Sequence, residues 1–385
     1  MASLLLALIY LAFISLGLPD SLLGSSWPVM QGELQAPLSF AGVITMIIAG
    51  GTIVSSLFAA RVIRKLGTGL VTALSVGLTA IALFGFSLSH SAAALCLWAI
   101  PYGLGAGAVD SALNNYAALH FSSRHMSWLH AFWGVGVTIS PNIMSFCLAR
   151  NLGWAMGYRS VAFLQIVLTA VLFLSLPLWK AHSPETGSTA PKTLTIPQAL
   201  KIPGVPFVLL AFFGFCALEC TAGLWASSYL VEFRQVAVET AARFAALFYL
   251  GETAGRFLTG LVADRFGDVK MIRAGILTMV AGVILIGLPL KTDVFALIGL
   301  VVVGLGAAPV YPCIIHSTPI RFGQENSQAL VGIQMASAYL GSTFMPPLFG
   351  LLAQHISMGL YPLFLSLFAL LMLIMSELLN KTVQI

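Results

Sequence analysis

Long apolar runs, separated by short groups of charged residues, glycine and proline, follow one another along the whole chain. Each run is long enough for a helix to cross a bilayer core of about 30 Å, which takes about 20 residues. Strands of a membrane barrel would instead alternate over segments of about 10 residues. We therefore predict an all-α membrane protein with twelve transmembrane helices, near residues 3–28, 38–62, 68–88, 92–120, 126–150, 156–180, 204–230, 238–263, 269–289, 293–320, 326–353 and 358–379.

A long polar stretch separates the first six runs from the last six. It is rich in Ser, Thr, Pro and Lys, which is typical of a linker. We predict an N-terminal six-helix bundle over residues 1–181, a cytoplasmic linker over 182–203 and a C-terminal six-helix bundle over 204–385.

Two motifs recur at nearly the same spacing and indicate that the second half is a copy of the first. Gly51–Gly67, GTIVSSLFAARVIRKLG, aligns without a gap with GETAGRFLTGLVADRFG at an offset of 200 residues. Gly103–Phe121, GLGAGAVDSALNNYAALHF, aligns with GLGAAPVYPCIIHSTPIRF at an offset of 201 residues. The predicted fold is therefore two pseudo-symmetric bundles of six helices in the same orientation.

Composition agrees with a protein that has lipid as its solvent. Hydrophobic residues make up 59% of the chain and charged residues 8%, whereas a soluble domain carries about 25% charged residues. Lys and Arg collect in the loops on one side, so the positive-inside rule places both termini in the cytoplasm. We expect a monomeric, multi-pass protein of the cell membrane, in a bacterial inner membrane, that binds no nucleic acid.

The sequence shows no nucleophile and base pair, no phosphate-binding loop and no metal-ligand spacing. We therefore expect no enzymatic activity, no metal and no organic cofactor. The cysteines all fall inside apolar runs and are expected to be free thiols: Cys96, Cys147, Cys216, Cys220 and Cys313.

Over essentially its whole length the chain resembles the major facilitator superfamily. The segment GLVADRFGDVK, at 260–270, is similar to that superfamily's loop signature between the second and third helices of a half. The resemblance implies a structural or gating role for Asp264 and Arg265, which would lock helix ends together. The first half has Arg64 at the position of Asp264, so the usual carboxylate is missing there. The resemblance also implies two halves that rock around a midplane site.

Within that superfamily the chain resembles the fucose-galactose-glucose:proton symporter family. The motifs are GLPDSLLGSSWP in the first run, GLGAGAVDSALNNYAALHF in the fourth and WLHAFWGVG in the fifth. Members carry an acid in the first helix and another in the fourth, implicated in proton coupling and sugar binding. The resemblance implies these roles for Asp20 and Asp110, although the family often has the longer Glu in the fourth helix.

The first run carries side chains suited to a polyol. Helical spacing places Trp27 and Gln31 on the face of Asp20. Carboxylates and amides form hydrogen bonds with hydroxyl groups, and an aromatic ring covers the C–H face of a pyranose. The alternative is that Asp20 only caps or kinks a helix interrupted by Gly17 and Pro19, with Trp27 in an interfacial belt.

The fourth run places Asp110 on one face with Gly107 and Asn114. We expect Asp110, Asn114 and the neighbouring Asn115 to bind the solute. The alternative is a structural hydrogen bond in a seam of small residues. His130, in the fifth run, is a candidate solute ligand and second proton carrier, or a histidine satisfied by hydrogen bonds within the bundle.

In the second half, Glu219 lies near the middle of the seventh run with Trp225 close by. We expect both to complete a site with the first half, although the repeat aligns Glu219 with Pro19 and lends it no support. Glu252 and Arg256 are spaced four residues apart on the eighth run, so they are expected to neutralise each other in a structural or gating role.

No Lys or Arg lies in the interior of the first, fourth or seventh run. An ionised side chain at the bilayer centre costs from about 2.5 to more than about 10 kcal/mol, and burial without a cation favours a neutral carboxyl group. We therefore predict that Asp20, Asp110 and Glu219 bind and release protons, with sodium as the alternative coupling ion.

Three functions fit this sequence. The first is proton-coupled symport of a monosaccharide or a similar small polar solute by alternating access. The second is proton-coupled export of a drug or metabolite, for which an acid in the first helix would serve equally. The third is a sensor that does not transport, which the lack of an appended domain disfavours.

Overall fold

The computed structural model describes residues 2–36, 40–180, 194–236, 238–290 and 292–383. Almost all of these residues are helical, and no strand occurs within these ranges. A helix satisfies its backbone N–H and C=O groups internally, as a membrane interior requires. The predicted all-α fold is confirmed.

The predicted spans of the first half correspond to the helices found there. The span predicted at 3–28 is divided at Ser21 between two helices, and the others differ from the prediction mostly at their ends. These helices are α1 (Ala2–Asp20), α2 (Leu22–Glu33), α3 (Phe40–Leu66), α4 (Thr68–Ser87), α5 (Ala92–His120), α6 (Ser123–Ala149), α7 (Gly153–Leu174) and the short α8 (Leu176–Lys180).

The second half repeats this series with one further break. The predicted span 293–320 is divided at Ala308 and Pro309, because proline lacks the N–H group that would continue the helix. The elements are α9 (Ile196–Leu200), α10 (Val205–Ser228), η1 (Tyr229–Phe233), α11 (Val238–Phe266), α12 (Asp268–Gly287), α13 (Val294–Ala307), α14 (Val310–Phe322), α15 (Gln324–His355), η2 (Met358–Leu360) and α16 (Tyr361–Thr382).

Ten helical segments among the described residues are long and apolar enough to cross a membrane. The two other long helices, α11 with 29 residues and α15 with 32, have the length but carry more polar residues. Glu252 and Arg256 lie on α11, and α15 begins with the sequence QENSQ. With these two helices the described chain supplies the twelve spans that the sequence predicts.

By its packing the chain divides into two compact units. Unit 1 comprises Met1–Tyr116 and Leu129–Thr193, and unit 2 comprises Ala117–Trp128 and Leu194–Ile385. The α5–α6 segment, Ala117–Trp128, therefore packs with the second half of the chain, although α5 and α6 continue into unit 1. The predicted linker, 182–203, lies outside the described residues as far as 193 and then contains α9.

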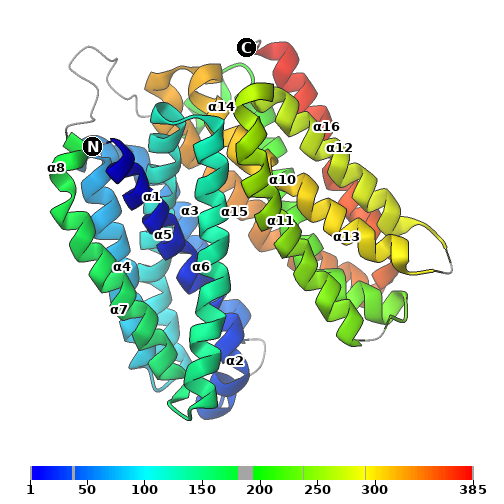
Figure 1. The fold of residues 1–385 in the computed structure, drawn as a ribbon, viewed down its shortest axis with the longest axis horizontal. Coiled ribbons are helices and arrows are strands. Elements are labelled where there is room, and N and C mark those ends of the chain that lie inside the picture. The colour runs from blue at the N-terminus through cyan, green and yellow to red at the C-terminus, as the bar shows by residue number, and fades with distance from the viewer. Residues whose placement is uncertain (1, 37–39, 181–193, 237, 291, 384–385) are drawn as a thin grey trace. The chain divides into compact units, whose positions relative to one another are not determined.

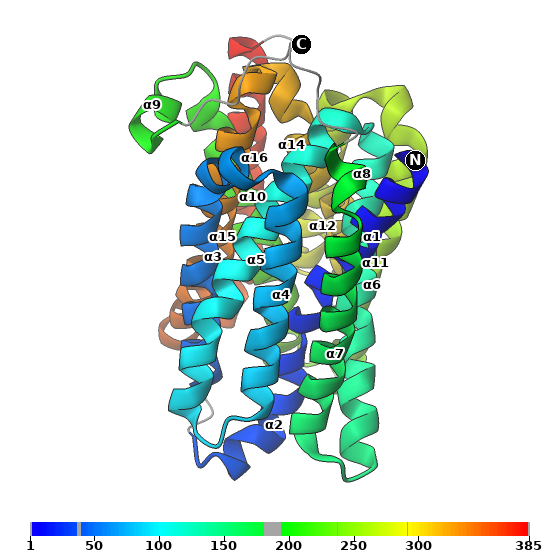
Figure 2. The same ribbon diagram turned by 90° about the vertical axis from the view of Figure 1, so that its left-hand side faces the viewer.

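Small residues let helices approach closely within each unit. In unit 1, α4 lies alongside α7 (Figure 2). In unit 2, α12 lies alongside α13 (Figure 1), and a Cβ on Gly282 or on Gly299 would press against the other glycine's carbonyl oxygen. Close backbone packing of this kind stabilises helix pairs in a membrane, where lipid tails are as apolar as the side chains.

The internal repeat is visible in the backbone. Gly67 and Gly267, 200 residues apart, both have a φ of 79°, with ψ of 156° and 157°. Each glycine directly precedes a helix of 20 residues, α4 or α12. A side chain at a positive φ is strained, so glycine is required at this turn in both halves.

The second repeated motif places a glycine at the same helix crossing in each unit. A Cβ on Gly103 would collide with the carbonyl oxygen of Ile48 where α5 crosses α3. A Cβ on Gly304 would collide with the carbonyl oxygen of Phe248, 200 residues after Ile48, where α13 crosses α11. The two halves therefore share a packing contact as well as a sequence pattern.

Adding one methyl group at this crossing is expected to destabilise either unit. Gly103→Ala and Gly304→Ala should each lower the Tm of the purified protein, because overpacking a close contact costs about 1–3 kcal/mol. Gly50→Ala is the matched control, since a Cβ there meets nothing within 4 Å. The change from glycine to alanine raises the helix propensity equally in all three variants. If Gly103→Ala and Gly304→Ala had the same Tm as the control, the close backbone contact at these crossings would be refuted.

Candidate functional site

Asp20, the last residue of α1, accepts hydrogen bonds from two neutral donors of unit 1. The Tyr102 hydroxyl donates to Oδ1 at 3.0 Å, and the Trp133 indole N–H donates to Oδ2 at 2.9 Å. Tyr102 is buried and Trp133 half-buried, whereas Asp20 itself is exposed. The carboxylate is therefore fixed on its protein side and remains accessible to a proton or to a hydroxyl donor.

Two glycines bring α1 and α6 into backbone contact beside Asp20. A Cβ on Gly17 would collide with the carbonyl oxygen of Trp133, and a Cβ on Gly136 would collide with that of Ile14. Only residues without a side chain allow this approach. The crossing carries Trp133 to within hydrogen-bond distance of the acid.

Asp110 belongs to a chain of hydrogen bonds that runs from α5 to α6. Asn114 Nδ2 donates to Asp110 Oδ1 at 2.7 Å, and Asn114 Oδ1 lies 3.0 Å from Nε2 of His130. An amide oxygen only accepts, so Nε2 carries a hydrogen. Asn114 and His130 are buried and Asp110 is half-buried. Asp110 is close enough to Asp20 for the two carboxylates to repel each other.

The structure therefore brings together two of the predicted acids and two of their predicted polar neighbours in unit 1. It also adds Tyr102 and Trp133, which the sequence analysis did not select. Trp133 lies within the motif WLHAFWGVG, but nothing in the local sequence shows that it meets an acid more than a hundred residues earlier.

Three other predicted ligands of unit 1 lie on α2 and α5. Trp27, on α2, is 4% exposed and packs in a hydrophobic cluster with Tyr158. Asn115 is 5% exposed, and Gln31 is half-buried on the last turns of α2. One residue, Ser21, separates α1 from α2.

In unit 2, Glu219 and Glu252 share one guanidinium group. Arg256 Nη2 lies 3.2 Å from Glu219 Oε1 and also forms an ion pair with Glu252 one turn earlier on α11. All three are largely buried, with side-chain exposures of 16% for Glu219, 5% for Glu252 and 4% for Arg256. We call these residues the unit 2 triad. With both acids ionised its net charge is −1, and one bound proton makes it neutral.

The sequence predicted the spacing of Glu252 and Arg256 but not the third member of the triad. Glu219 comes from a different helix, α10, and reaches Arg256 through tertiary packing. Gly223 on α10 also admits the Tyr249 hydroxyl, which a Cβ at that position would obstruct. Tyr249 interacts electrostatically with both acids.

Trp225, predicted to bind the solute, uses its indole N–H inside unit 2. It donates to the carbonyl oxygen of Pro346 at 2.8 Å, and its ring meets Phe349 edge to face. Gly350 faces the same ring, and a Cβ there would press against it. These contacts pack α10 against α15.

Asp264, from the loop signature, holds the α5–α6 segment to α11. Its Oδ1 accepts the backbone N–H of Arg124 at 3.0 Å, and its Oδ2 accepts the Ser122 hydroxyl at 3.0 Å. The Arg124 side chain forms an ion pair with it at 3.5 Å. Arg265 lies over the ring of Phe266, and Arg64 is exposed at the end of α3.

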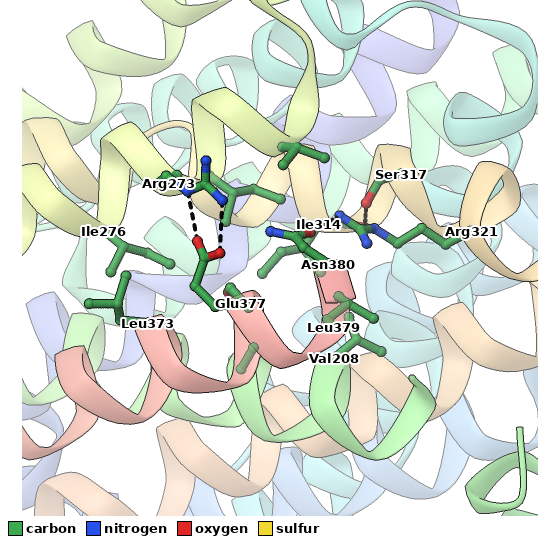
Figure 3. Close-up of a pocket in the computed structure, with 14 residues that line it drawn as sticks. Val208, Arg273, Ile276, Ile314, Ser317, Arg321, Leu373, Glu377, Leu379 and Asn380 are labelled. Atoms are coloured by element: carbon green, nitrogen blue, oxygen red, sulfur yellow. Dashed lines mark hydrogen bonds and ion pairs between the residues drawn. The ribbon is translucent and has the colours of Figure 1, made fainter. Parts of the chain in front are cut away.

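Two hollows lie elsewhere in the units. One, between α10, α12, α14 and α16, has Arg273 and Glu377 pointing toward one another at 2.7 and 2.8 Å (Figure 3). In the same hollow Arg321 donates to Asn380 Oδ1 at 2.7 Å. The other, between α6 and α7, is lined mainly by apolar side chains such as Phe146. None of the candidate acids lines either hollow.

Comparison with known proteins agrees with the helical repeat and with the loop signature. Residues 9–246 and 207–381 match the profile of the Major Facilitator Superfamily. The uncharacterized transporter y4wD of Sinorhizobium fredii is 25% identical over 375 residues, which cover 92% of this chain and 92% of that protein.

Solved structures match over nearly the whole chain. FucP in its outward conformation superimposes with a TM-score of 0.77 at 14% identity, covering 97% of each chain. FucP is the fucose:proton symporter of E. coli. The human organic anion transporter MFSD10 superimposes with a TM-score of 0.75 at 17% identity, covering 97% of this chain and 98% of that one. At such identities the likeness is one of fold. With profile matches that together span most of its length, the chain belongs to the major facilitator superfamily, as a multi-pass membrane transporter of small solutes.

Proposed function

We propose that this transporter is a proton-coupled symporter of a monosaccharide or a similar small polar solute, and that it works by alternating access. The observation that carries the proposal is the exposed Asp20 carboxylate, fixed by Tyr102 and Trp133. A carboxylate accepts hydrogen bonds from sugar hydroxyl groups, and the neighbouring indole offers an apolar face for the C–H groups of a pyranose. Trp133 takes the part that the sequence analysis gave to Trp27.

The likeness to FucP supports a sugar as the solute, although a shared fold at 14% identity leaves the cargo open. The likeness to MFSD10 supports the second candidate, proton-coupled export of an organic solute. Both candidates need an acid that is reachable from water, and they differ in the direction of movement relative to the proton.

Charge balance supports the proton as the coupling ion. Asp20 and Asp110 are close enough to repel each other, and the donors to Asp20 are neutral groups. In unit 2, the triad has one more acid than base. Because an uncompensated charge inside a membrane costs several kcal/mol, the triad gains stability by taking up a proton. Sodium, the alternative ion, would need oxygen ligands around it.

We further propose that the transporter lies in a bacterial inner membrane as a monomer, with both termini in the cytoplasm. The distribution of Lys and Arg supports this orientation, because basic residues in short loops remain on the cytoplasmic side.

The direction of proton movement decides between the two candidates. Purified protein is first screened by thermal shift against sugars, amino acids and organic ions, because a ligand of the folded state raises its Tm. The stabilising solute is then added outside right-side-out and everted vesicles. For a symporter, uptake should alkalinise the medium around right-side-out vesicles. For an exporter, the medium around right-side-out vesicles should not become alkaline. Solute added to everted vesicles should instead acidify the medium, because the exporter carries the solute into the vesicle in exchange for protons.

Removing the charge of either acid in unit 1 should uncouple transport from the proton. Asp20→Asn and Asp110→Asn are each expected to abolish solute accumulation against a gradient, because a carrier that no longer moves a proton with its solute can only equilibrate the solute. Glu232→Gln, an exposed acid on η1, is the matched control and should leave accumulation unchanged. Accumulation at the wild-type level in both Asn variants would refute the coupling role.

The unit 2 triad predicts different effects on Tm and on transport for substitutions of Glu219 and Arg256. Glu219→Gln leaves the neutral pair of Glu252 and Arg256, so it should keep the wild-type Tm but lose pH-dependent uptake. Arg256→Met leaves two buried acids without a cation and should lower the Tm clearly, since breaking a buried ion pair costs about 3–5 kcal/mol. A purely structural triad would instead show a lowered Tm in both variants and an unchanged pH profile in Glu219→Gln.

A further inference from the structure

His316, on α14, uses both ring nitrogens to connect α12 with the α5–α6 segment. Nδ1 lies 2.6 Å from Oδ2 of Asp268, the first residue of α12, and Nε2 lies 3.0 Å from the carbonyl oxygen of Phe121. The Ser123 hydroxyl lies 2.9 Å from Nδ1 and also bonds to the Asp268 carboxylate. The side chains of His316 and Asp268 are 15% and 8% exposed.

These contacts require a particular number of protons. The carbonyl oxygen of Phe121 only accepts hydrogen bonds, so Nε2 must carry a hydrogen. Nδ1 faces a carboxylate oxygen at 2.6 Å, so one more proton must lie between these two atoms, whichever of them carries it. The pair of His316 and Asp268 is therefore neutral as a whole and holds one proton more than a neutral histidine beside an ionised acid.

We propose that His316 and Asp268 form a proton-binding site that holds the α5–α6 segment against α12 and α14 while the proton is bound and releases it when the proton leaves. The ligand is a proton from the water at this end of the helices. This site is separate from Asp20, from Asp110 and from the unit 2 triad, and nothing in the comparisons assigns it a role.

Loss of the proton breaks one of the two contacts of the imidazole. A neutral ring has a single N–H group. If that group stays on the charged Asp268, the lone pair of Nε2 faces the carbonyl oxygen of Phe121 and repels it. If it stays on the Phe121 carbonyl, the lone pair of Nδ1 faces the carboxylate. In the first case, which the negative charge of Asp268 favours, the segment loses its hydrogen bond to the imidazole. In the second case α14 loses its charge-assisted hydrogen bond to α12, and the segment keeps its contact with His316.

Other ionisable groups surround the pair on each neighbouring helix. Asp264 on α11 and Asp268 interact electrostatically with His316. Cys313 and Arg321 on α14 interact with Asp268. From α6, His125 interacts electrostatically with Asp264 and Arg124, and the sequence of α13 holds no ionisable residue. The segment itself contains two further histidines, His120 and His125.

The first half lacks this site. The repeat aligns His316 with Asn115 and Asp268 with Thr68, at offsets of 201 and 200. Neither of those side chains exchanges a proton near neutral pH. The proton-binding site is therefore a property of unit 2 and is not shared by both halves of the fold.

The consequence for transport rests on the proposed alternating access. The α5–α6 segment joins two helices that continue into unit 1 but packs in unit 2. A movement of α5 and α6 during alternating access would have to break this attachment of the segment to α12 and α14. A proton at His316 would then slow that release when the water at this end is acidic and would permit it when that water is alkaline.

The proposal is tested by hydrogen–deuterium exchange of purified full-length protein in nanodiscs between pH 5.5 and 8.5. Protection of the amides in residues 119–126, after correction for the intrinsic pH dependence of exchange, should fall about tenfold from the acidic to the alkaline end, as expected for the loss of one hydrogen bond to a charged group. The experiment needs no solute, so its outcome does not depend on the proposed cargo.

Five variants assign the titration. In His316→Gln the protection of this segment should be low and independent of pH, and in Asp268→Asn the midpoint should move to lower pH. His120→Gln, His125→Gln and His355→Gln, the last at the far end of α15, should all keep the wild-type profile. A flat profile in the wild type, or loss of the pH dependence in His120→Gln or His125→Gln, would overturn the proposal.

His316→Gln needs a check on folding. Protection in a distant helix, α7, should equal that of the wild type. If it does not, the titration of the His316 ring is followed directly by NMR in histidine-labelled wild-type protein. A chemical shift that titrates together with the exposure of the segment supports the proposal, and one that does not titrate between pH 5.5 and 8.5 refutes it.

Discussion

The free energy of a net charge in an apolar interior constrains the acids that lie on the membrane-spanning helices of this protein. A soluble protein can leave an unpaired carboxylate facing water, but a span has only its own helices, a bound solute or a proton with which to compensate charge. The acids meet this constraint in different ways. Asp20 is stabilised by an indole and a phenol, Asp110 by an amide, and Glu219 and Glu252 by a single guanidinium. In the triad of Glu219, Glu252 and Arg256, two acids share one guanidinium.

Close helix packing makes these arrangements possible. Without glycine at Gly17 and Gly136, α1 and α6 would lie farther apart and Trp133 would not reach Asp20. Without Gly103 and Gly304, the repeated crossings of α3 with α5 and of α11 with α13 would open. Because the helices touch through their backbones, side chains of ordinary length meet partners on neighbouring helices. Packing in a membrane thus positions the chemistry as well as stabilising the fold.

Duplication gave the two halves the same framework and different chemistry. The turns at Gly67 and Gly267 have nearly identical backbone angles. Only the second copy of the motif, however, carries the carboxylates Asp264 and Asp268. The first copy instead carries Asp110, which the repeat aligns with Tyr311. The ionisable groups have therefore diverged while the glycines that fix the crossings have been retained. Unit 1 holds Asp20 and Asp110, and unit 2 holds the triad of Glu219, Glu252 and Arg256 together with the cluster around His316.

The sequence by itself determined the membrane environment, the twelve spans and the duplication, because hydropathy and glycine spacing act over short stretches of chain. It also selected Asp20, Asp110 and Glu219, since charge is rare in a span and stands out wherever it occurs. It did not determine the partners of these acids. Helical spacing predicts Trp27 on the face of Asp20, and the structure shows Trp27 in a hydrophobic cluster and Trp133 donating to Asp20. Arg256 and Glu219, like His316 and Phe121, meet only through tertiary packing. Periodicity reports what one helix presents on each face, whereas the partner across a helix crossing depends on how whole helices pack.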